Sequence, residues 1–564
     1  MRKRVLFFVL TIIILLSSLS YSLILRYDRY YNYKEVFNAI QRIKAKYPNF
    51  IKIEVIGKSY QGRDLWAVTI NNHRTGKASN KPAMYVDANI HGNEIQGTEV
   101  TLYIMDYLLS NYGKIKKITN LLDRVSFYII PIVNPDGRAV FMDKPNTPSS
   151  SRVNKKPIDD DKDGLFDEDD YDDLDKDGNI VQMRKKVTPG TGHFKLSPKD
   201  PRIMVRVKPG EKGDYMLLGM EGIDNDGDGK VNEDPLGGID MNRTYGFNWM
   251  PPFIQWGTSD YPLQTSETAA IGRFLISHKN IAVTQDFHNS GGMILRGPGA
   301  SNKGRYPYMD IKVYDYIGKE GEKLLPGYEY MISWKDLYPV FGGFNDFSYR
   351  TLGILSFTNE LYKAQQDFNK DGKVTKEERM KWNDEILHGS GFVNWHHYKH
   401  PQYGDIEIGG WKKMTTRVTP GFQLEELCHR NGAFVIFNAY HLPYIKIEEV
   451  KKEKIRNNIY RITALLINER MIPTRTSQAV IHNIGKPDFV SIKGEKITVI
   501  SGGVETNHQF KRYLPQKHHP EKIKVNSIEG MGHRYIQWIV KGSGDILIVY
   551  NSEKGGKKTA EIKL

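Results

Sequence analysis

Apolar residues recur along the chain at two spacings, and these spacings predict alternating helices and strands. Helical spacing of Val36, Ile40 and Ile43 predicts a helix beginning at Tyr33, and a similar pattern covers Gln96–Leu109. Apolar runs of strand length occur between these segments and farther along the chain. The predicted strands are Ile51–Ile56, Leu65–Ile70, Ala83–Val86, Val125–Val133 and Ile281–His288. The alternation indicates an α/β domain with its functional site at the carboxyl edge of the sheet.

A second region follows the α/β pattern. Helical spacing over Leu424–Tyr440, with a possible break at Asn431-Gly432, closes the predicted catalytic domain near residue 444. Beyond it, short β-rich runs recur with turn residues between them, which favours a small β-sandwich over residues 445–564. The clearest runs are Tyr460–Ile467, Lys496–Ile500, Tyr535–Val540 and Asp545–Tyr550.

The turn after the strand Ala83–Val86 carries the first candidate chemistry. His91 and Glu94 are three residues apart, so an imidazole and a carboxylate can converge on one metal ion such as Zn2+. With 16 histidines in the chain, such a pair alone is a weak signal. Its weight comes from the motifs that accompany it.

These motifs resemble the zinc carboxypeptidase family, of the carboxypeptidase A and B type. The resemblance rests on Ile56–Arg63, His91–Glu94 and Asn134–Gly137. It spans roughly residues 30–444 and is to the exported, bacterial type of family member. It implies a mixed eight-stranded sheet with helices on both faces and one catalytic Zn2+. It also implies hydrolysis of the C-terminal peptide bond of a peptide or protein substrate with a free C-terminus.

The resemblance assigns a role to each candidate site residue. These residues occur along the chain in the same order as in the family, so a chance occurrence of the whole set is implausible. The implied roles are zinc ligand for His91, Glu94 and His288, general base for Glu360, polarisation of the scissile carbonyl for Arg184, binding of the terminal carboxylate for Asn242 and Arg243, and closure over substrate for Tyr338.

The chemistry implied by this set is specific. Three protein ligands leave the fourth zinc position for water, which is the pattern of a catalytic site. An arginine offers a bidentate fork to a carboxylate, so Arg243 favours an exopeptidase. By resemblance Asn345 lies near the floor of the specificity pocket, and a neutral amide there argues against a strict Lys/Arg preference.

Acidic inserts lie near residues 159–178, 224–234 and 367–378. The third fits a twelve-residue EF-hand loop, with Asp367, Asn369, Asp371 and Glu378 as side-chain ligands. The others carry only the front half of the motif, D-x-D-x-D-G. Closely spaced carboxylates repel one another unless a cation binds, so structural Ca2+ is expected.

The N-terminal residues 1–25 read as a targeting segment. Arg2, Lys3 and Arg4 precede an uncharged apolar run, which is typical of a signal peptide or of an uncleaved membrane anchor. We therefore expect a secreted or cell-envelope protein whose membrane contact is limited to this segment. The single Cys428 excludes an intramolecular disulfide.

The net charge of +14 adds little to the functional assignment. Residues 445–564 hold 22 Lys and Arg against 12 Asp and Glu, which favours a solvated basic surface. No nucleic-acid motif accompanies it, so no nucleic-acid partner is expected. Two alternatives to the carboxypeptidase remain open: a cell-wall peptide amidase or endopeptidase on the same zinc centre, and a calcium-dependent binding protein with an inactive peptidase domain.

Overall fold

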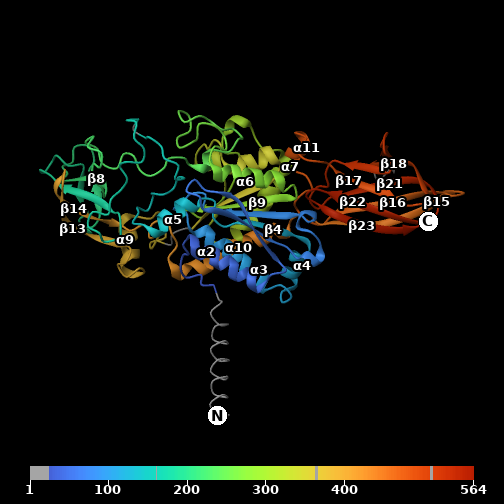
Figure 1. Ribbon diagram of the computed structural model, residues 1–564, viewed down its shortest axis with the longest axis horizontal. Coiled ribbons are helices and arrows are strands. Elements are labelled where there is room, and N and C mark those ends of the chain that lie inside the picture. The colour runs from blue at the N-terminus through green and yellow to red at the C-terminus, as the bar shows by residue number, and fades with distance from the viewer. Residues whose placement is uncertain (1–24, 161, 363–365, 508–511) are drawn as a thin grey trace, which may run out of the picture.

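The computed structural model describes residues 25–564 except 161, 363–365 and 508–511. The predicted signal or anchor, residues 1–25, thus lies almost wholly outside the described residues. In the described part of the chain, none of the helices combines the length and apolar character needed to cross a bilayer. The chain forms three parts in a row, with the largest sheet in the middle (Figure 1).

The central part is built on a mixed eight-stranded sheet, as predicted. Its middle strands are parallel, and antiparallel pairs extend the sheet on both sides. In spatial order the strands are β1 (Ile51–Lys58), β2 (Asp64–Ile70), β4 (Ser126–Ile130), β3 (Ala83–Ala88), β9 (Ile281–Asn289), β12 (Leu355–Leu361), β10 (Met293–Arg296) and β11 (Glu329–Ile332).

Helices cover both faces of this sheet (Figure 1), because the strands are apolar on both sides. Along β3, Met84 and Val86 enter one core while Ala83 and Tyr85 enter the other. One core is closed by α2 (Tyr33–Lys46), α3 (Gln96–Ser110), α4 (Lys116–Arg124) and α10 (Gly421–Tyr440), the other by α6 (Ser266–Ser277), and α7 (Tyr308–Leu324) packs on β10 and β11.

The possible break at Asn431-Gly432 does not occur in the structure. Helix α10 continues through Asn431 and Gly432. The Asn431 side chain donates to the carbonyl of Leu427 at 3.0 Å, and Gly432 packs against Tyr103 and Ile104 of α3. The small residue therefore permits close approach of two helices instead of ending one.

A six-stranded antiparallel sheet forms the second part, which the sequence pattern did not reveal. It combines segments that are far apart in the chain, and α9 (Lys376–Glu385) lies beside it (Figure 1). Its strands, in spatial order, are β13 (Phe392–His400), β14 (Gly404–Trp411), β5 (Gln182–Lys186), β8 (Tyr215–Met220), β6 (Phe194–Leu196) and β7 (Met204–Arg206).

The C-terminal part consists of two antiparallel sheets that enclose a core centred on Trp538. Together with the central sheet, these all-β sheets agree with the predicted fold class. One sheet contains β15 (Ile445–Arg456), β16 (Ile459–Asn468), β21 (His533–Gly542), β18 (Ile497–Asn507) and β19 (Arg512–Pro515), and the other contains β20 (Lys522–Val525), β17 (Asp488–Lys493), β22 (Asp545–Ser552) and β23 (Gly556–Lys563).

Candidate metal centre and peptide-binding pocket

The turn after β3 is held in place by a buried polar network. Asn89 adopts a φ of 60°, and its side-chain amide donates to the carbonyls of His91 at 2.7 Å and Gly92 at 3.1 Å. Only glycine fits at position 92, because a Cβ there would lie 2.2 Å from the carbonyl oxygen of Ser151. The sequence thereby fixes the direction in which the His91 and Glu94 side chains leave the backbone.

A buried arginine supports this turn from behind. Arg138, in α5 (Pro135–Asp143), is fully buried and pairs with the equally buried Glu99 at 2.8 Å. Its guanidinium also donates to the carbonyl of Ile95 at 2.9 Å and to Thr98 Oγ1 at 2.9 Å. The segment after Glu94 is therefore anchored by charge-assisted hydrogen bonds.

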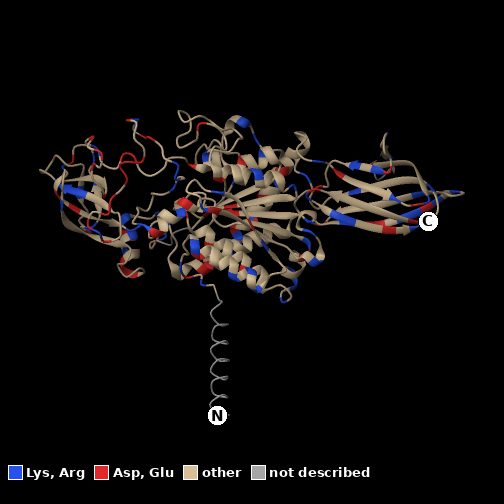
Figure 2. Cartoon of the chain, viewed as in Figure 1, with Lys and Arg blue, Asp and Glu red and all other residues tan. Residues whose placement is uncertain are grey.

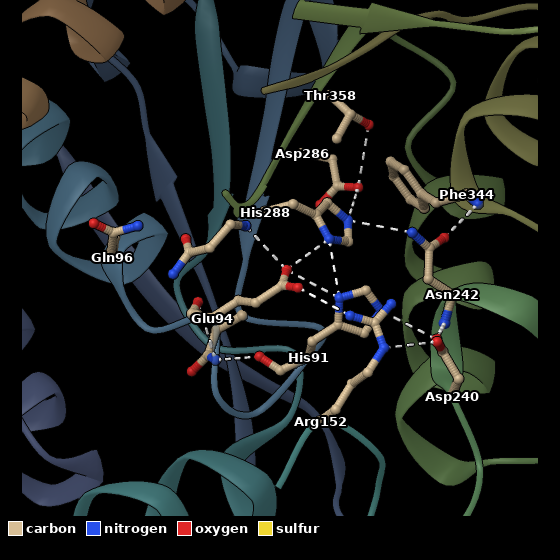
Figure 3. Close-up of polar contacts among 12 residues, drawn as sticks. His91, Glu94, Gln96, Arg152, Asp240, Asn242, Asp286, His288, Phe344 and Thr358 are labelled. Carbon is tan, nitrogen blue, oxygen red and sulfur yellow. Dashed lines mark hydrogen bonds and ion pairs between the residues drawn. The ribbon is translucent and has the colours of Figure 1, made fainter. Parts of the chain in front are cut away.

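The three predicted zinc ligands converge at the carboxyl edge of the central sheet (Figure 3). Glu94 Oε2 lies 2.9 Å from His91 Nδ1 and 2.8 Å from His288 Nδ1, and the two Nδ1 atoms are 3.1 Å apart. All three residues are at most 2% exposed. Two imidazole nitrogens and one carboxylate oxygen directed at one point form a donor set that suits Zn2+ and leaves a position for water.

Two carboxylates orient the histidines from the far side of each ring. Asp240 Oδ1 lies 3.1 Å from His91 Nε2, and Asp286 Oδ2 lies 2.8 Å from His288 Nε2. A carboxylate on Nε2 fixes the tautomer in which Nδ1 keeps its lone pair for a metal. The hydrogen-bonding pattern of this chain therefore fits a zinc ion.

Two arginines neutralise the acidic side of the cluster. Arg152 donates to Glu94 Oε1 at 3.0 Å and to Asp240 Oδ2 at 3.1 Å, and Arg417 reaches Glu94 Oε1 at 3.3 Å. Burial alone would raise the pKa of Glu94, but the electrostatic and hydrogen-bonding effects of the adjacent His91 and His288 hold that pKa well below its usual range. The Glu94 carboxylate thus stays ionised, as a metal ligand must.

Glu360 lies on β12, directly beside His288 on the parallel strand β9. The pKa of its carboxyl is raised to about 7, because burial disfavours the charged form and the charge of Glu94 adds to that effect. His288, Arg152 and Arg417 act in the opposite direction. A carboxyl group with a pKa near neutrality is suited to accept and return a proton.

One pocket brings most of the predicted substrate-binding residues to this centre. It is lined by His91, Arg152, Asn242, Arg243, His288, Tyr338, Asn345 and Glu360, among others. Tyr338 is 55% exposed on the loop that borders the pocket. The Asn345 side chain accepts hydrogen bonds from Ser356 Oγ at 2.7 Å and Thr358 Oγ1 at 3.1 Å.

Arg243 is the cation of this pocket that lacks an acidic partner. It is 9% exposed, and its Nη1 donates to the carbonyl of Asn242 at 2.9 Å. Among the described residues, no carboxylate lies within ion-pair distance of it. The Asn242 side-chain nitrogen lies 3.2 Å from His288 Nε2, and its side-chain oxygen accepts from the Phe344 amide (Figure 3). A buried guanidinium of this kind has the geometry to bind a carboxylate through two hydrogen bonds.

The prediction for Arg184 is wrong, because the structure does not bring this residue to the pocket. Arg184 lies on β5 of the second sheet, where it pairs with Glu407 at 2.9 Å and covers the Trp395 ring at 4.1 Å. Besides Arg243, the arginine that lines the pocket is Arg152. No sequence motif distinguished Arg152, and the acidic inserts separate it from Asp240, one of the two carboxylates it contacts.

The other residues that the sequence did not single out are Asp240, Asp286 and Arg417. Two of them carried a usable signal: Asp286 precedes His288 by two positions on one strand, so both side chains lie on the same face. Asp240 is two residues before Asn242 and caps the short 3-10 turn Met241–Arg243, where its side chain accepts from the Asn242 amide. Arg417 carried no sequence signal, because its position depends on the long connection before α10.

The four predicted calcium ligands of the third insert gather around one loop. Asp367 Oδ2 accepts from the Gly372 amide at 2.8 Å, and Asn369 Oδ1 accepts from the Asp371 amide at 2.9 Å. Glu378 Oε1 accepts from the Phe368 amide at 3.0 Å, while Oε2 caps helix α9. These side-chain oxygens thus satisfy backbone donors of their own loop.

Comparison with known proteins defines the class. The zinc carboxypeptidase family matches residues 36–177 and 219–384, more than half of the chain, and the chain therefore belongs to this family. Arg152 lies inside the matched segments, whereas Arg184 lies in the interruption between them. Residues 444–563 match a family described only as a domain of unknown function.

Individual relatives resemble a limited stretch of the chain. Carboxypeptidase D of Rattus norvegicus is 32% identical over 135 residues, 24% of this chain and 10% of that protein. A zinc carboxypeptidase of Saccharothrix mutabilis subsp. capreolus is 33% identical over 20% of this chain and 25% of that protein. The matches thus span a quarter or less of these relatives. The crystal structure of carboxypeptidase A from Helicoverpa armigera aligns with a TM-score of 0.44 and 17% identity over 74% of this chain and 75% of that chain.

The orientation of His288 gives a test of the metal centre. Replacing Asp286 with Asn removes the charge that orients the ring, so zinc affinity should fall about 10- to 100-fold. Competition with a chromophoric chelator measures the zinc affinity of the variant and of the wild type. Asp405→Asn is the matched control, because Asp405 contacts His397 at 3.0 Å on the surface. Equal zinc affinity of the Asp286 variant and the wild type would contradict the assigned role.

Proposed function

We propose that the protein is a zinc metallocarboxypeptidase that removes C-terminal residues from peptides or proteins. The observation that carries the proposal is the joint placement of the His91, Glu94 and His288 donors, Glu360 and the unpaired Arg243 in one pocket. Membership of the zinc carboxypeptidase family supports the zinc dependence and the substrate class.

Each residue of the pocket has a part in the proposed reaction. His91, Glu94 and His288 would hold Zn2+. When bound, this ion would lower the pKa of a water molecule and act as a Lewis acid toward the carbonyl oxygen. Glu360 takes the proton of the attacking water and later delivers it to the leaving amine. The guanidinium of Arg152 stabilises negative charge that develops on the carbonyl oxygen.

The same geometry supports an exopeptidase. Arg243 binds the terminal carboxylate of the substrate, with Asn242 beside it, and Tyr338 covers the bound residue. The side chain of that residue faces Asn345, which is neutral and already hydrogen-bonded. A strict preference for Lys or Arg is therefore not expected.

The proposal extends to export and to calcium. The basic and apolar N-terminal sequence supports a secreted or cell-envelope location, with membrane contact only through that segment. The EF-hand pattern supports Ca2+ at the loop of Asp367, Asn369, Asp371 and Glu378. Both remain predictions, as do the wall-peptide and inactive-scaffold alternatives.

The experiment that tests the proposal is release of free amino acids from a peptide library with randomised C-termini. The zinc-loaded protein should release them, a zinc chelator should stop the release, and Glu360→Gln should lower the rate about 100- to 10,000-fold while zinc stays bound. Zinc content and circular dichroism of the variant are the controls. No release by zinc-loaded wild type, or equal rates for wild type and variant, would contradict the proposal.

A separate experiment tests whether Arg152, and not Arg184, polarises the scissile carbonyl. Arg152→Met should lower kcat/KM about 100- to 1000-fold, because one donor to the developing charge is lost. Arg184→Met, which affects only the second sheet, should leave kcat/KM nearly unchanged. Zinc content of both variants excludes loss of the metal as the cause. The reverse order of effects would restore Arg184 as the polarising residue.

A further inference from the structure

The C-terminal part of the chain, residues 445–564, meets the central part at helix α7, beside which α11 (Ser477–Ile481) lies (Figure 1). Acidic and basic residues of both parts lie near this junction (Figure 2). One of them is Asp310, in the first turn of α7, which is only 1% exposed. Its Oδ1 accepts from the Ser477 amide at 2.8 Å, and its Oδ2 accepts from the Gln478 amide at 2.9 Å. A buried carboxylate needs such donors, so Asp310 depends on the C-terminal part for two hydrogen bonds.

Asp310 also accepts a hydrogen bond from within the central part. The hydroxyl of Tyr349, in η7 (Phe347–Thr351), donates to Asp310 Oδ2 at 2.7 Å. The Tyr349 ring packs on the Tyr306 ring, with the two ring centroids 3.9 Å apart. Both tyrosines are at most 4% exposed. Because protein interiors are close-packed and transmit strain, a shift of Asp310 would displace both rings.

Tyr306 connects these rings to the wall of the substrate pocket. Its hydroxyl donates to Asp346 Oδ1 at 2.8 Å, and Asp346 Oδ2 accepts from the Gly299 amide at 2.8 Å. Asp346 and Gly299 line the pocket, and Asp346 directly follows Asn345. The contacts are tight, because a Cβ at position 299 would lie 2.7 Å from the carbonyl oxygen of Val340. The position of Tyr306 therefore affects the shape of the pocket.

The C-terminal part also contacts the end of the segment that follows the pocket wall. Thr476 Oγ1 donates to the Gly353 carbonyl at 3.1 Å, and Lys554 Nζ donates to the same carbonyl at 2.8 Å. Gly353 has a φ of 63°, and a Cβ there would lie 2.7 Å from the Cβ of Ala479. Only glycine permits this close approach of the two parts. The segment is thus fixed by the pocket at one end and by the C-terminal part at the other.

We propose that the C-terminal part positions the wall of the substrate pocket through Asp310, Tyr349 and Tyr306. None of these three residues lines the pocket, so each is a positioning residue that acts through Asp346. The wall carries Asn345, which faces the last side chain of the substrate in the proposed reaction. This role rests on the proposed carboxypeptidase activity. It gives a region that matches only a domain of unknown function a part in selecting the last residue of the substrate.

Two variants of the full chain test the proposal. Tyr349→Phe removes the hydroxyl that donates to Asp310 and keeps the ring, whereas Asp310→Asn replaces an acceptor oxygen by an amide donor. In both variants, the ratio of kcat/KM between the best and the worst C-terminal residue of a peptide series should fall about 2- to 30-fold, because the wall is less well fixed. Zinc affinity should stay unchanged, because neither residue contacts a zinc ligand. Amide hydrogen exchange of residues 344–354, which requires no activity, should become faster.

Tyr550→Phe is the matched control. It removes a similar hydrogen bond, from a buried tyrosine to Asp488 at 2.8 Å, inside the C-terminal part and away from the junction. This variant should keep the wild-type ratio and the wild-type exchange of residues 344–354. The effects of Asp310→Asn and Tyr306→Phe on the ratio should be non-additive, because both changes act on the same wall.

An unchanged ratio in both Tyr349→Phe and Asp310→Asn would overturn the proposal, and so would an equal fall in Tyr550→Phe. Failure of the proposed peptidase activity is distinguishable, because the wild type would then release no amino acid from any peptide. In that case hydrogen exchange decides: unchanged exchange of residues 344–354 in both variants would overturn the positioning role.

Discussion

The parallel pairing of β3 with β9 is the constraint on which the metal centre depends. Because Ala88 lies opposite Phe287 in this register, the turn that carries His91 and Glu94 begins beside the strand end that carries His288. The parallel pairing of β9 with β12 then places Glu360 level with His288. A shift of one residue in either pair would turn these side chains to the other face of the sheet.

The metal centre also requires that its buried carboxylates be balanced by positive charge. Glu94 and Asp240 are buried carboxylates on opposite sides of the His91 ring, and Arg152 bridges them. Burial would raise the pKa of Asp240, yet Arg152, Arg243 and His91 hold that pKa well below its usual range. The Arg152 guanidinium thus helps to keep Asp240, which orients His91, ionised and also pairs with the ligand Glu94.

The sequence predicted five strands of the central sheet and three of its helices through local periodicity, and it predicted the eight-stranded sheet and the grouping of His91, Glu94 and His288 through the family resemblance. It was insufficient for Arg152. The choice between Arg152 and Arg184 depends on how the acidic insert folds, and β5 joins its sheet through β14, more than 200 residues later in the chain. Such pairings leave no local pattern, so the second sheet and the position of Arg417 could not be predicted. Helix α10 differs for another reason, since the packing of Gly432 against α3 overrides its low helix propensity.

The central claim is that a zinc-loaded pocket positions a free C-terminal carboxylate on Arg243. The most direct measurement compares kcat/KM for two peptides of identical sequence, one with a free C-terminal carboxylate and the other amidated. The account predicts cleavage of the last peptide bond in the free acid and almost none in the amide, because the amide leaves the buried guanidinium unpaired. Equal cleavage of both peptides, or cleavage at an internal bond, would contradict it.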